Sequence, residues 1–204
     1  MWVRVATFEG VDKDKIDKLT QERMSSGEMT PPEGMNSILV LDDANAKKRK
    51  FLAFFDNKDA IDAAEAGFEQ MGDTIPEDIR GKRTSVHHYE VVVQEGDIDA
   101  AKAARVSVLE GSPASIDDSV GKVKAETLPQ VRELPGNVGA IGLADRKSGN
   151  SIVITLWESP DALRKTEQQA DKLRAQAAQS GGQRIGSVDR YEVAVAQQLS
   201  GVHA

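Results

Sequence analysis

The sequence contains no cysteine and only three histidines among its 204 residues. Disulfides, thiolate metal sites and cysteine nucleophiles are therefore excluded. No apolar run approaches the roughly 20 residues that a membrane-spanning helix requires. The opening segment MWVRVATFEG lacks the basic stretch and apolar run of a secretory signal. These absences predict a cytoplasmic protein with no membrane partner.

Positive charge is also scarce. The chain carries 26 Lys and Arg against 33 Asp and Glu, so its formal net charge is −7. An acidic protein repels phosphate backbones, so no nucleic-acid partner is expected. The basic run KKRK (Lys47 to Lys50) reads as the solvated tip of a hairpin. Hydrophobic residues at 39% and charged residues at 29% are ordinary for a globular protein.

Two nearly identical stretches stand out against this background. SVHHYEVVV (85–93) and SVDRYEVAV (187–195) lie 102 residues apart. FFDNKDAI (54–61) and LWESPDAL (156–163) are separated by the same 102 residues. A constant offset over separate stretches indicates an internal duplication. The predicted organisation is a first unit at 1–94, a linker at 95–103, a second unit at 104–197 and a tail at 198–204.

Each unit has the same order of predicted elements, β-α-β-β-α-β, which is the ferredoxin-like arrangement. In the second unit Ser159 is a good N-cap for a helix running from Pro160 to Ala178. Pro129 falls inside the other helical pattern of that unit and should kink or end it. Gly34 after PPE and Gly136 after ELP mark turns.

The strands are apolar at nearly every position, as in ILVL, FLAFF and IVITLW. Two helices can cover only one face of each sheet, so the other face needs a second cover. The sequence therefore predicts an α+β fold in which two tandem ferredoxin-like units pack sheet to sheet as a pseudo-dimeric α+β barrel. One chain would form this intramolecular pseudo-dimer, and further oligomerisation stays open.

The junctions FFDNKDAI and LWESPDAL and the closing segments YEVVV and YEVAV resemble those of the dimeric α+β barrel superfamily, close to the antibiotic-biosynthesis-monooxygenase-like (ABM) domains. The resemblance covers the whole chain, twice. It implies a site in a cleft between sheet and helices, and activities that include cofactor-free oxygenases of polycyclic quinol-type substrates. Haem-degrading members use a histidine on the second helix, which neither unit has. No cofactor is therefore expected.

The histidines are the candidate catalytic residues. His87 and His88 are neighbours in a predicted strand, so their side chains point to opposite faces and no metal site is expected. Either could act as a general base, because the pKa of histidine lies near neutrality. The structural alternative is a histidine at a strand end with no catalytic role. His203 belongs to the tail, which is predicted to be disordered.

Aromatic side chains are the candidate ligand-binding residues. Tyr89 and Tyr191 recur in the two units, and Trp157 could form the wall for a flat aromatic ligand. Recurrence in both units also suits a purely structural role. The repeated arginines and glutamates predict two cross-strand pairs, Arg4 with Glu90 and Arg105 with Glu192.

Two functions follow from these observations. The first is a cofactor-free monooxygenase, or a related enzyme, acting on a small apolar aromatic or polyketide-like substrate. The alternative is a non-catalytic small-molecule-binding or stress-associated barrel. A further hypothesis gives one unit the site and leaves the other structural, because His87-His88 in one unit corresponds to Asp189-Arg190 in the other.

Overall fold

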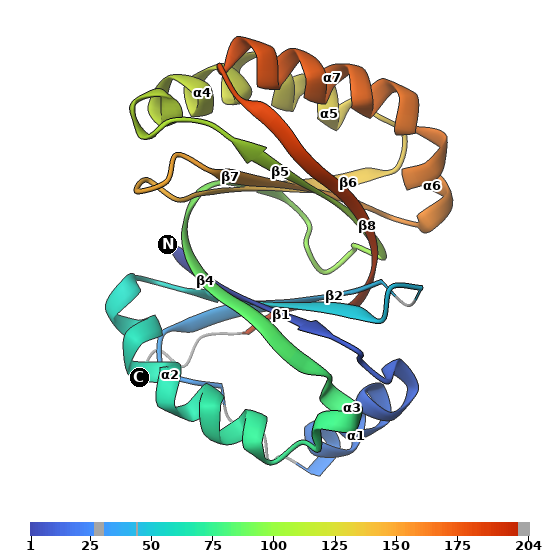
Figure 1. The fold of residues 1–204 in the computed structure, drawn as a ribbon. Coiled ribbons are helices and arrows are strands. Elements are labelled where there is room, and N and C mark those ends of the chain that lie inside the picture. Colours follow the sequence, from blue (N-terminus) through green and yellow to red (C-terminus); the bar gives the residue numbers. More distant parts are fainter. Residues whose placement is uncertain (27–30, 44, 200–204) are drawn as a thin grey trace. The chain divides into compact units, whose positions relative to one another are not determined.

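The computed structural model describes residues 1–26, 31–43 and 45–199. The chain divides into two compact units, which Figure 1 shows as ribbons. Unit 1 is Met1–His88 together with Ala194–Ala204, and unit 2 is Tyr89–Val193. Both divisions fall inside the repeated strand motif. His203 and the rest of 200–204 lie outside the described residues.

The first repeat contains strands and helices in the order β-α-β-β-α-β, with one short additional helix. They are β1 (Trp2–Glu9), α1 (Lys13–Ser26), β2 (Met35–Asp43), β3 (Lys48–Phe55), α2 (Lys58–Asp73), α3 (Glu77–Arg80) and β4 (Lys82–Gly96).

The second repeat follows the same order with a more divided helical layer. Its elements are β5 (Ala103–Glu110), the 3₁₀ helix η1 (Pro113–Ser115), α4 (Ile116–Lys122), the π-helix η2 (Val123–Thr127), α5 (Leu128–Arg132), β6 (Asn137–Ala144), β7 (Ser151–Trp157), α6 (Pro160–Lys165), α7 (Glu167–Ser180) and β8 (Arg184–Gln198).

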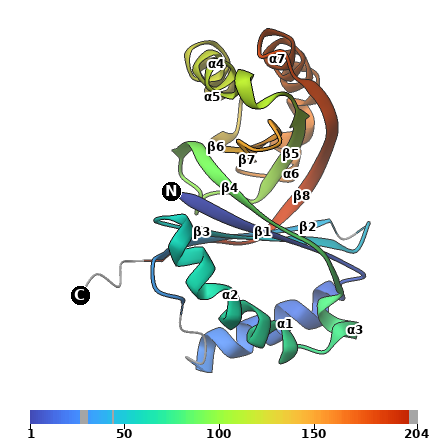
Figure 2. The ribbon, with the colours of Figure 1, turned by 60° about the vertical axis from the view of Figure 1, so that its left-hand side comes forward.

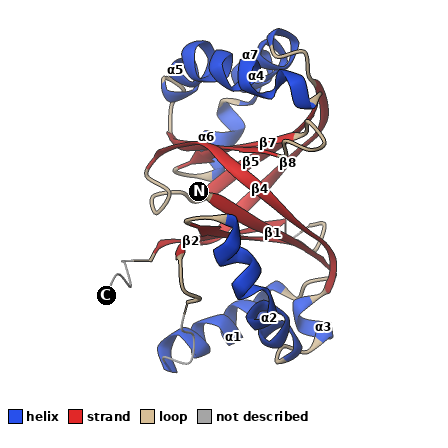
Figure 3. Cartoon of the chain, turned by 90° about the vertical axis from the view of Figure 1, so that its left-hand side faces the viewer, coloured by secondary structure: helices blue, strands red, loops and turns tan. Residues whose placement is uncertain are grey.

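The hydrogen-bonded strand order is β1-β3-β2-β8-β5-β7-β6-β4, and it closes on itself. The closed order confirms the α+β barrel fold, with both halves supplied by one chain. β4 and β8 are each 15 residues long and contribute strand segments to both units. In each unit the helices lie on one face of the strands, as Figures 2 and 3 show.

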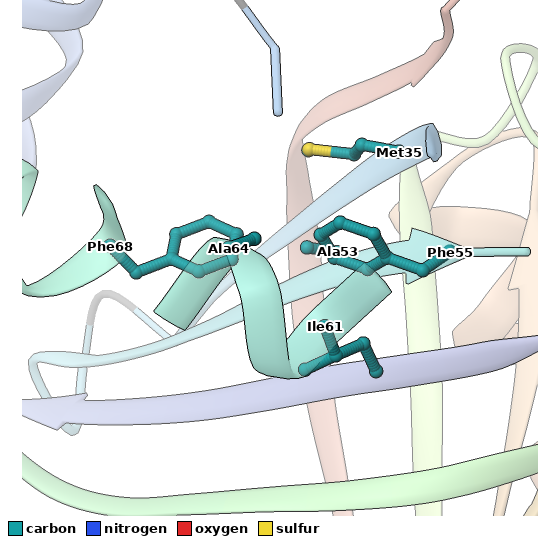
Figure 4. Close-up of a cluster of buried hydrophobic side chains, with 6 residues drawn as sticks. All are labelled: Met35, Ala53, Phe55, Ile61, Ala64 and Phe68. Atoms are coloured by element: carbon teal, nitrogen blue, oxygen red, sulfur yellow. The ribbon is translucent and has the colours of Figure 1, made fainter. Parts of the chain in front are cut away.

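The core between sheet and helix in unit 1 is built around Phe68 of α2. Its ring meets those of Phe51 and Phe55 of β3 edge-on, each at a centroid distance of 6.2 Å. Phe55, Ile61 and Phe68 are buried together with Met35, Ala53 and Ala64, the cluster drawn in Figure 4. Alternation along β3 directs Phe51, Ala53 and Phe55 to this layer.

The second helix of each unit begins at a side-chain cap. Asn57 accepts from the backbone N–H of Ala60, and Ser159 accepts from that of Ala162. The Ser159 prediction is confirmed. The expectation of one continuous helix from Pro160 to Ala178 is wrong, because α6 and α7 meet at Thr166. The Thr166 hydroxyl donates to the Ala162 and Leu163 carbonyls, an arrangement that bends helices.

The first helical region of unit 2 is interrupted by a π-helical turn shortly before Pro129, the position at which the sequence predicts a kink or an end. Leu128 begins α5, and Pro129 lies in its first turn, where a missing N–H breaks no hydrogen bond. The preceding π-helical turn, Val123–Thr127, carries two side chains into the interior of this unit. None of the helices in the described part of the chain is long and apolar enough to cross a membrane.

Candidate functional site

Unit 1 contains two adjoining cavities between its sheet and its helices. The first has a volume of about 160 Å³ and the second about 620 Å³. Both are lined by Val40, Phe51, Phe68 and Met71, so the strands β2 and β3 and the helix α2 form a shared apolar wall.

The polar lining of the smaller cavity is dominated by cations. Asp17 is the one acidic residue of its lining, against five arginines: Arg4, Arg23, Arg49, Arg80 and Arg83. What each guanidinium already bonds to decides which of them could meet a ligand.

Arg4 is fully engaged by a carboxylate. It is 2% exposed, and its Nε and Nη2 each donate to a Glu65 oxygen at 2.8 Å. Its guanidinium also lies 4.4 Å from the centroid of the Phe68 ring. The hydrogen bonds from Arg4 lower the pKa of Glu65. Arg4 therefore lines the cavity as a residue already paired with Glu65.

Arg49 is held by two acids. Its Nε donates to Asp42, which is buried, and its Nη2 donates to both Asp42 and Asp17, all at 2.6 Å. Burial raises the pKa of Asp17, but hydrogen bonds from Lys13 and Arg49 outweigh it, so this pKa is lowered. Asp17 therefore stays charged near neutral pH and is a poor general base there.

Arg80 differs from its neighbours. Its Nε donates to the Ile75 carbonyl at 3.1 Å, and it forms no ion pair with any carboxylate of the described residues. Arg83, by contrast, pairs with Glu69 at 2.6 Å, and Arg23 donates to the Thr74 hydroxyl at 2.9 Å. The apolar cavity is therefore lined by a guanidinium, that of Arg80, that forms no ion pair with a carboxylate of the described chain.

The two predicted catalytic histidines lie near this layer but do not line either unit 1 cavity. His88 Nε2 lies 3.7 Å from Glu65 and its Nδ1 lies 3.9 Å from Asp62. Burial lowers the pKa of His88, against the opposing effect of Glu65. His87 is exposed. Glu65, which lies beside His88, is hydrogen-bonded to Arg4, and Arg4 rather than His88 lines the smaller cavity. A base role for either histidine stays a prediction.

The corresponding space in unit 2 is nearly filled. Its cavity has a volume of about 60 Å³ and is lined by Arg105, Arg174 and Trp157, among others. Trp157 is fully buried, with the Arg105 guanidinium 5.1 Å from the centroid of its ring. Of the three predicted ligand-binding aromatics, Trp157 thus borders a cavity.

The two tyrosines do not line the cavities of either unit described above. Tyr191 is buried at the position opposite Ala104, on the sheet face away from Arg105. Burial raises the pKa of Tyr89. Their role in ligand binding stays a prediction.

The expected cross-strand Arg–Glu pairs are wrong. Arg4 pairs with Glu65 of α2, while Glu90 pairs with Arg146. Arg105 pairs with Glu167 of α7. The β5–β8 register places Arg190 opposite Arg105, and Glu192 lies opposite Ala103. The arginines therefore point to the helices, where helical carboxylates are nearer.

No group of three or more His, Asp or Glu side chains within 1–26, 31–43 and 45–199 could hold a metal ion. The residue that sequence reasoning missed is Arg80. The segment IRGKR (79–83) concentrates three cations beside a turn and could have drawn attention to it.

No family model matches the chain. The uncharacterized protein Rv2558 of Mycobacterium tuberculosis (strain H37Rv) is 33% identical over 75 residues, which cover 37% of this chain and 32% of that protein. A second uncharacterized protein of that strain, Rv2557, is 26% identical over 91 residues, covering 45% and 40%. The chain thus matches well under half the length of these relatives.

Solved structures resemble the chain over nearly its whole length. An anthrone oxidase-like protein aligns with a TM-score of 0.69 and 16% identity, covering 98% of this chain and 94% of that one. A monooxygenase-like protein of Listeria innocua aligns with a TM-score of 0.55 and 10% identity, covering 94% and 93%. At such identities the likeness shows the ABM-like, dimeric α+β barrel fold.

A heme-degrading enzyme of Listeria monocytogenes also shares this fold, with a TM-score of 0.51, 14% identity and coverage of 94% and 99%. The chain's second helices, α2 in unit 1 and α6 with α7 in unit 2, contain no histidine. One fold therefore accompanies different chemistries, and the site residues must carry the functional argument.

Proposed function

We propose that unit 1 binds a small, largely apolar aromatic or polyketide-like molecule that carries an acidic group. The observation that carries this proposal is the combination of an apolar cavity with Arg80, a guanidinium that lines it without a carboxylate partner in the described chain.

The size and lining suit such a ligand. Small-molecule sites usually enclose roughly 300–1,000 Å³. The larger unit 1 cavity of about 620 Å³ falls in that range, and it adjoins the smaller cavity that Arg80 lines. A flat ring could pack against Phe51, Phe68 and Met71, which line both cavities. Aromatic pairs of this kind favour offset or edge-to-face contacts.

The charge of Arg80 supplies selectivity. A carboxylate or phenolate that reaches it gains a charge-assisted hydrogen bond, which contributes about 1.5–3 kcal/mol. Because about 1.4 kcal/mol corresponds to a tenfold change in affinity, an acidic ligand should bind at least about tenfold more tightly than its neutral analogue.

The proposal can be tested by titrating the full chain with 1-hydroxy-2-naphthoate and with 1-naphthol, its analogue without the carboxylate. Arg80→Gln should weaken naphthoate binding by about tenfold or more and leave naphthol binding nearly unchanged. Arg164→Gln is a matched control, because Arg164 is an exposed arginine paired with Asp161 on α6. Equal affinities for both probes, unaffected by Arg80→Gln, would refute the proposal.

A second candidate is oxidation of the bound molecule, supported by the likeness to anthrone oxidase-like and monooxygenase-like folds. An acidic CH₂ group next to an aromatic ring would lose a proton, and the carbanion would pass one electron to dioxygen. Recombination of the radicals and loss of water convert CH₂ and O₂ into C=O and H₂O. The arginines would stabilise the anion, and His88 or His87 is the proposed base.

Anthrone is a suitable probe for this reaction, with anthraquinone formation followed by absorbance. If a histidine is the base, His87→Ala or His88→Ala should abolish turnover while naphthoate binding persists. Unchanged turnover in both variants would contradict the base assignment. If the unaltered protein binds naphthoate but leaves anthrone unoxidised, the oxygenase candidate fails and the binding proposal stands.

A further inference from the structure

Three positions of unit 1 have counterparts in unit 2, 101 residues later for the first and 102 residues later for the other two. Arg4 corresponds to Arg105 and Glu65 to Glu167, while His88 corresponds to Arg190. Each unit thus buries an arginine of its first strand against a glutamate of its second helical region. The third position carries a histidine in one unit and an arginine in the other.

In unit 1 the hydrogen bonds that Glu65 accepts from described side chains come from the buried Arg4. Both Glu65 oxygens accept from Arg4, and His88 stays 3.7 Å away. In unit 2, Arg190 takes up both oxygens of Glu167, with its Nε at 3.1 Å from Oε2 and its Nη2 on Oε1.

Arg105 is consequently left with a single bond to Glu167, from Nη2 at 3.0 Å. The same Nη2 donates to the Leu163 carbonyl at 2.8 Å. The Nε and Nη1 of Arg105 are buried without a hydrogen-bond partner in the described chain, although the residue is only 2% exposed. The Trp157 ring offsets part of the charge but offers no lone pair to these donors.

A cavity lies beside these donors. Arg105 and Arg174 both line the 60 Å³ space, whose other lining residues include Ser107, Thr127 and Thr155 and no acid. A water needs about 10–15 Å³ of such volume, so the cavity holds only a few water-sized particles.

The carboxylates beside this cavity are shared among several arginines. Three guanidiniums, those of Arg105, Arg174 and Arg190, share the carboxylates of Glu167 and Asp171. Arg190 is 45% exposed and also lies near Asp189, whereas Arg105 is buried beside a small, mostly apolar space. A buried charge in such surroundings requires a counterion or strong hydrogen-bond acceptors.

We propose that the unit 2 cavity binds one small monovalent anion, of halide or formate size, against Arg105, with water completing the remaining hydrogen bonds. The anion lies against the buried positive charge of Arg105 and accepts from the donors that Glu167 does not reach. The volume excludes an aromatic ligand, so this site does not depend on the function proposed for unit 1.

The test compares bromide with gluconate, which is too large for the cavity, at equal ionic strength. For the full chain, the unfolding temperature should rise with bromide relative to gluconate. Crystals grown in sodium bromide should show an anomalous peak within hydrogen-bond distance of Arg105. Arg190→His, which copies unit 1, should free Glu167 for Arg105 and weaken bromide binding by about tenfold or more.

Arg184→His is the matched control, since Arg184 lies on the same strand in an exposed pair with Glu110. It should keep both the bromide response and the anomalous peak. The proposal would be overturned if bromide-grown crystals of the unaltered protein showed only water beside Arg105 and the unfolding temperatures in the two salts were equal. This outcome does not depend on whether Arg190→His folds. A peak that survives in Arg190→His would overturn the role given to Arg190.

Discussion

The two units share a fold but differ in the space between sheet and helices. Unit 1 keeps cavities of about 160 and 620 Å³, whereas the cavity of unit 2 measures about 60 Å³. Unit 2 buries Trp157 where unit 1 has Phe55, and its π-helical turn Val123–Thr127 adds Val123 and Thr127 to the interior. Duplication has thus kept the backbone order while the interiors diverged, as expected if one unit carries the ligand site.

The buried charges diverge as well. Arg49, Asp42 and Asp17 form an ion-pair network at the unit 1 cavity. The positions equivalent to Asp42 and Arg49 in unit 2 are Ala144 and Ser151, which cannot form that network. In unit 1 a buried ion-pair network therefore lies at the cavity, whereas in unit 2 the equivalent region is nearly filled.

The largest expected effect comes from breaking that network. Asp42→Asn leaves the buried Arg49 without its main counter-charge and should lower the free energy of unfolding by about 3 kcal/mol. Denaturant unfolding measures this directly. Glu110→Gln, which breaks the exposed pair with Arg184, should change stability little. Equal losses in the two variants would contradict the special role of the unit 1 network.

The next largest effect is expected from removing the charge of Glu167, a residue of unit 2 whose pKa is lowered. Burial raises the pKa of Glu167, but hydrogen bonds from Arg190 and Arg105 lower it to about 2. Glu167→Gln should cost about 2 kcal/mol at neutral pH, allowing for solvent screening of a partly exposed group.

The sign of the pH dependence follows from that pKa. A carboxylate with a depressed folded-state pKa stabilises the protein above its unfolded pKa and loses this contribution as the pH falls from about 4.5 to 2. Unfolding curves of the unaltered protein and Glu167→Gln should therefore converge over this range. A constant gap between them would contradict the ion-pair account.

The smallest expected effect is a pH dependence of stability that comes from His88, the unit 1 counterpart of Arg190. Burial lowers the folded-state pKa of His88, so the unfolded chain binds its proton more readily. The protein should therefore lose a contribution below about 1 kcal/mol as the pH falls through the ordinary histidine pKa of about 6.5. His88→Gln should lack this loss when unfolding temperatures at pH 7.5 and 5.5 are compared. If His88→Gln lost more stability than the unaltered protein between pH 7.5 and 5.5, the lowered pKa given to His88 would be contradicted.

The sequence predicted the fold because the relevant signals repeat. The 102-residue offset and the almost continuously apolar strands indicated a duplicated barrel, and Ser159 marked a helix start correctly. The break at Thr166 was missed, because it depends on which carbonyls its hydroxyl meets. The Arg4 and Arg105 partners were missed because a repeated pair of letters does not reveal which face of a sheet each side chain occupies.

The candidate site was harder to predict. The exchange of His88 for Arg190 was visible in the sequence, but its consequence depends on Glu65 and Glu167, which lie more than 20 residues earlier in the chain. The cavity at Arg80 arises from how helices pack over strands, and no periodicity records an unfilled volume.

The most direct test of the difference between the units is a crystal structure of the full chain with 1-hydroxy-2-naphthoate. We predict density for the naphthoate in the unit 1 cavity, with its carboxylate at Arg80 and its rings against Phe51 and Phe68, and none for it in the unit 2 cavity. Naphthoate bound at Trp157 in unit 2, or absent from unit 1 in crystals grown at a saturating concentration, would contradict the account.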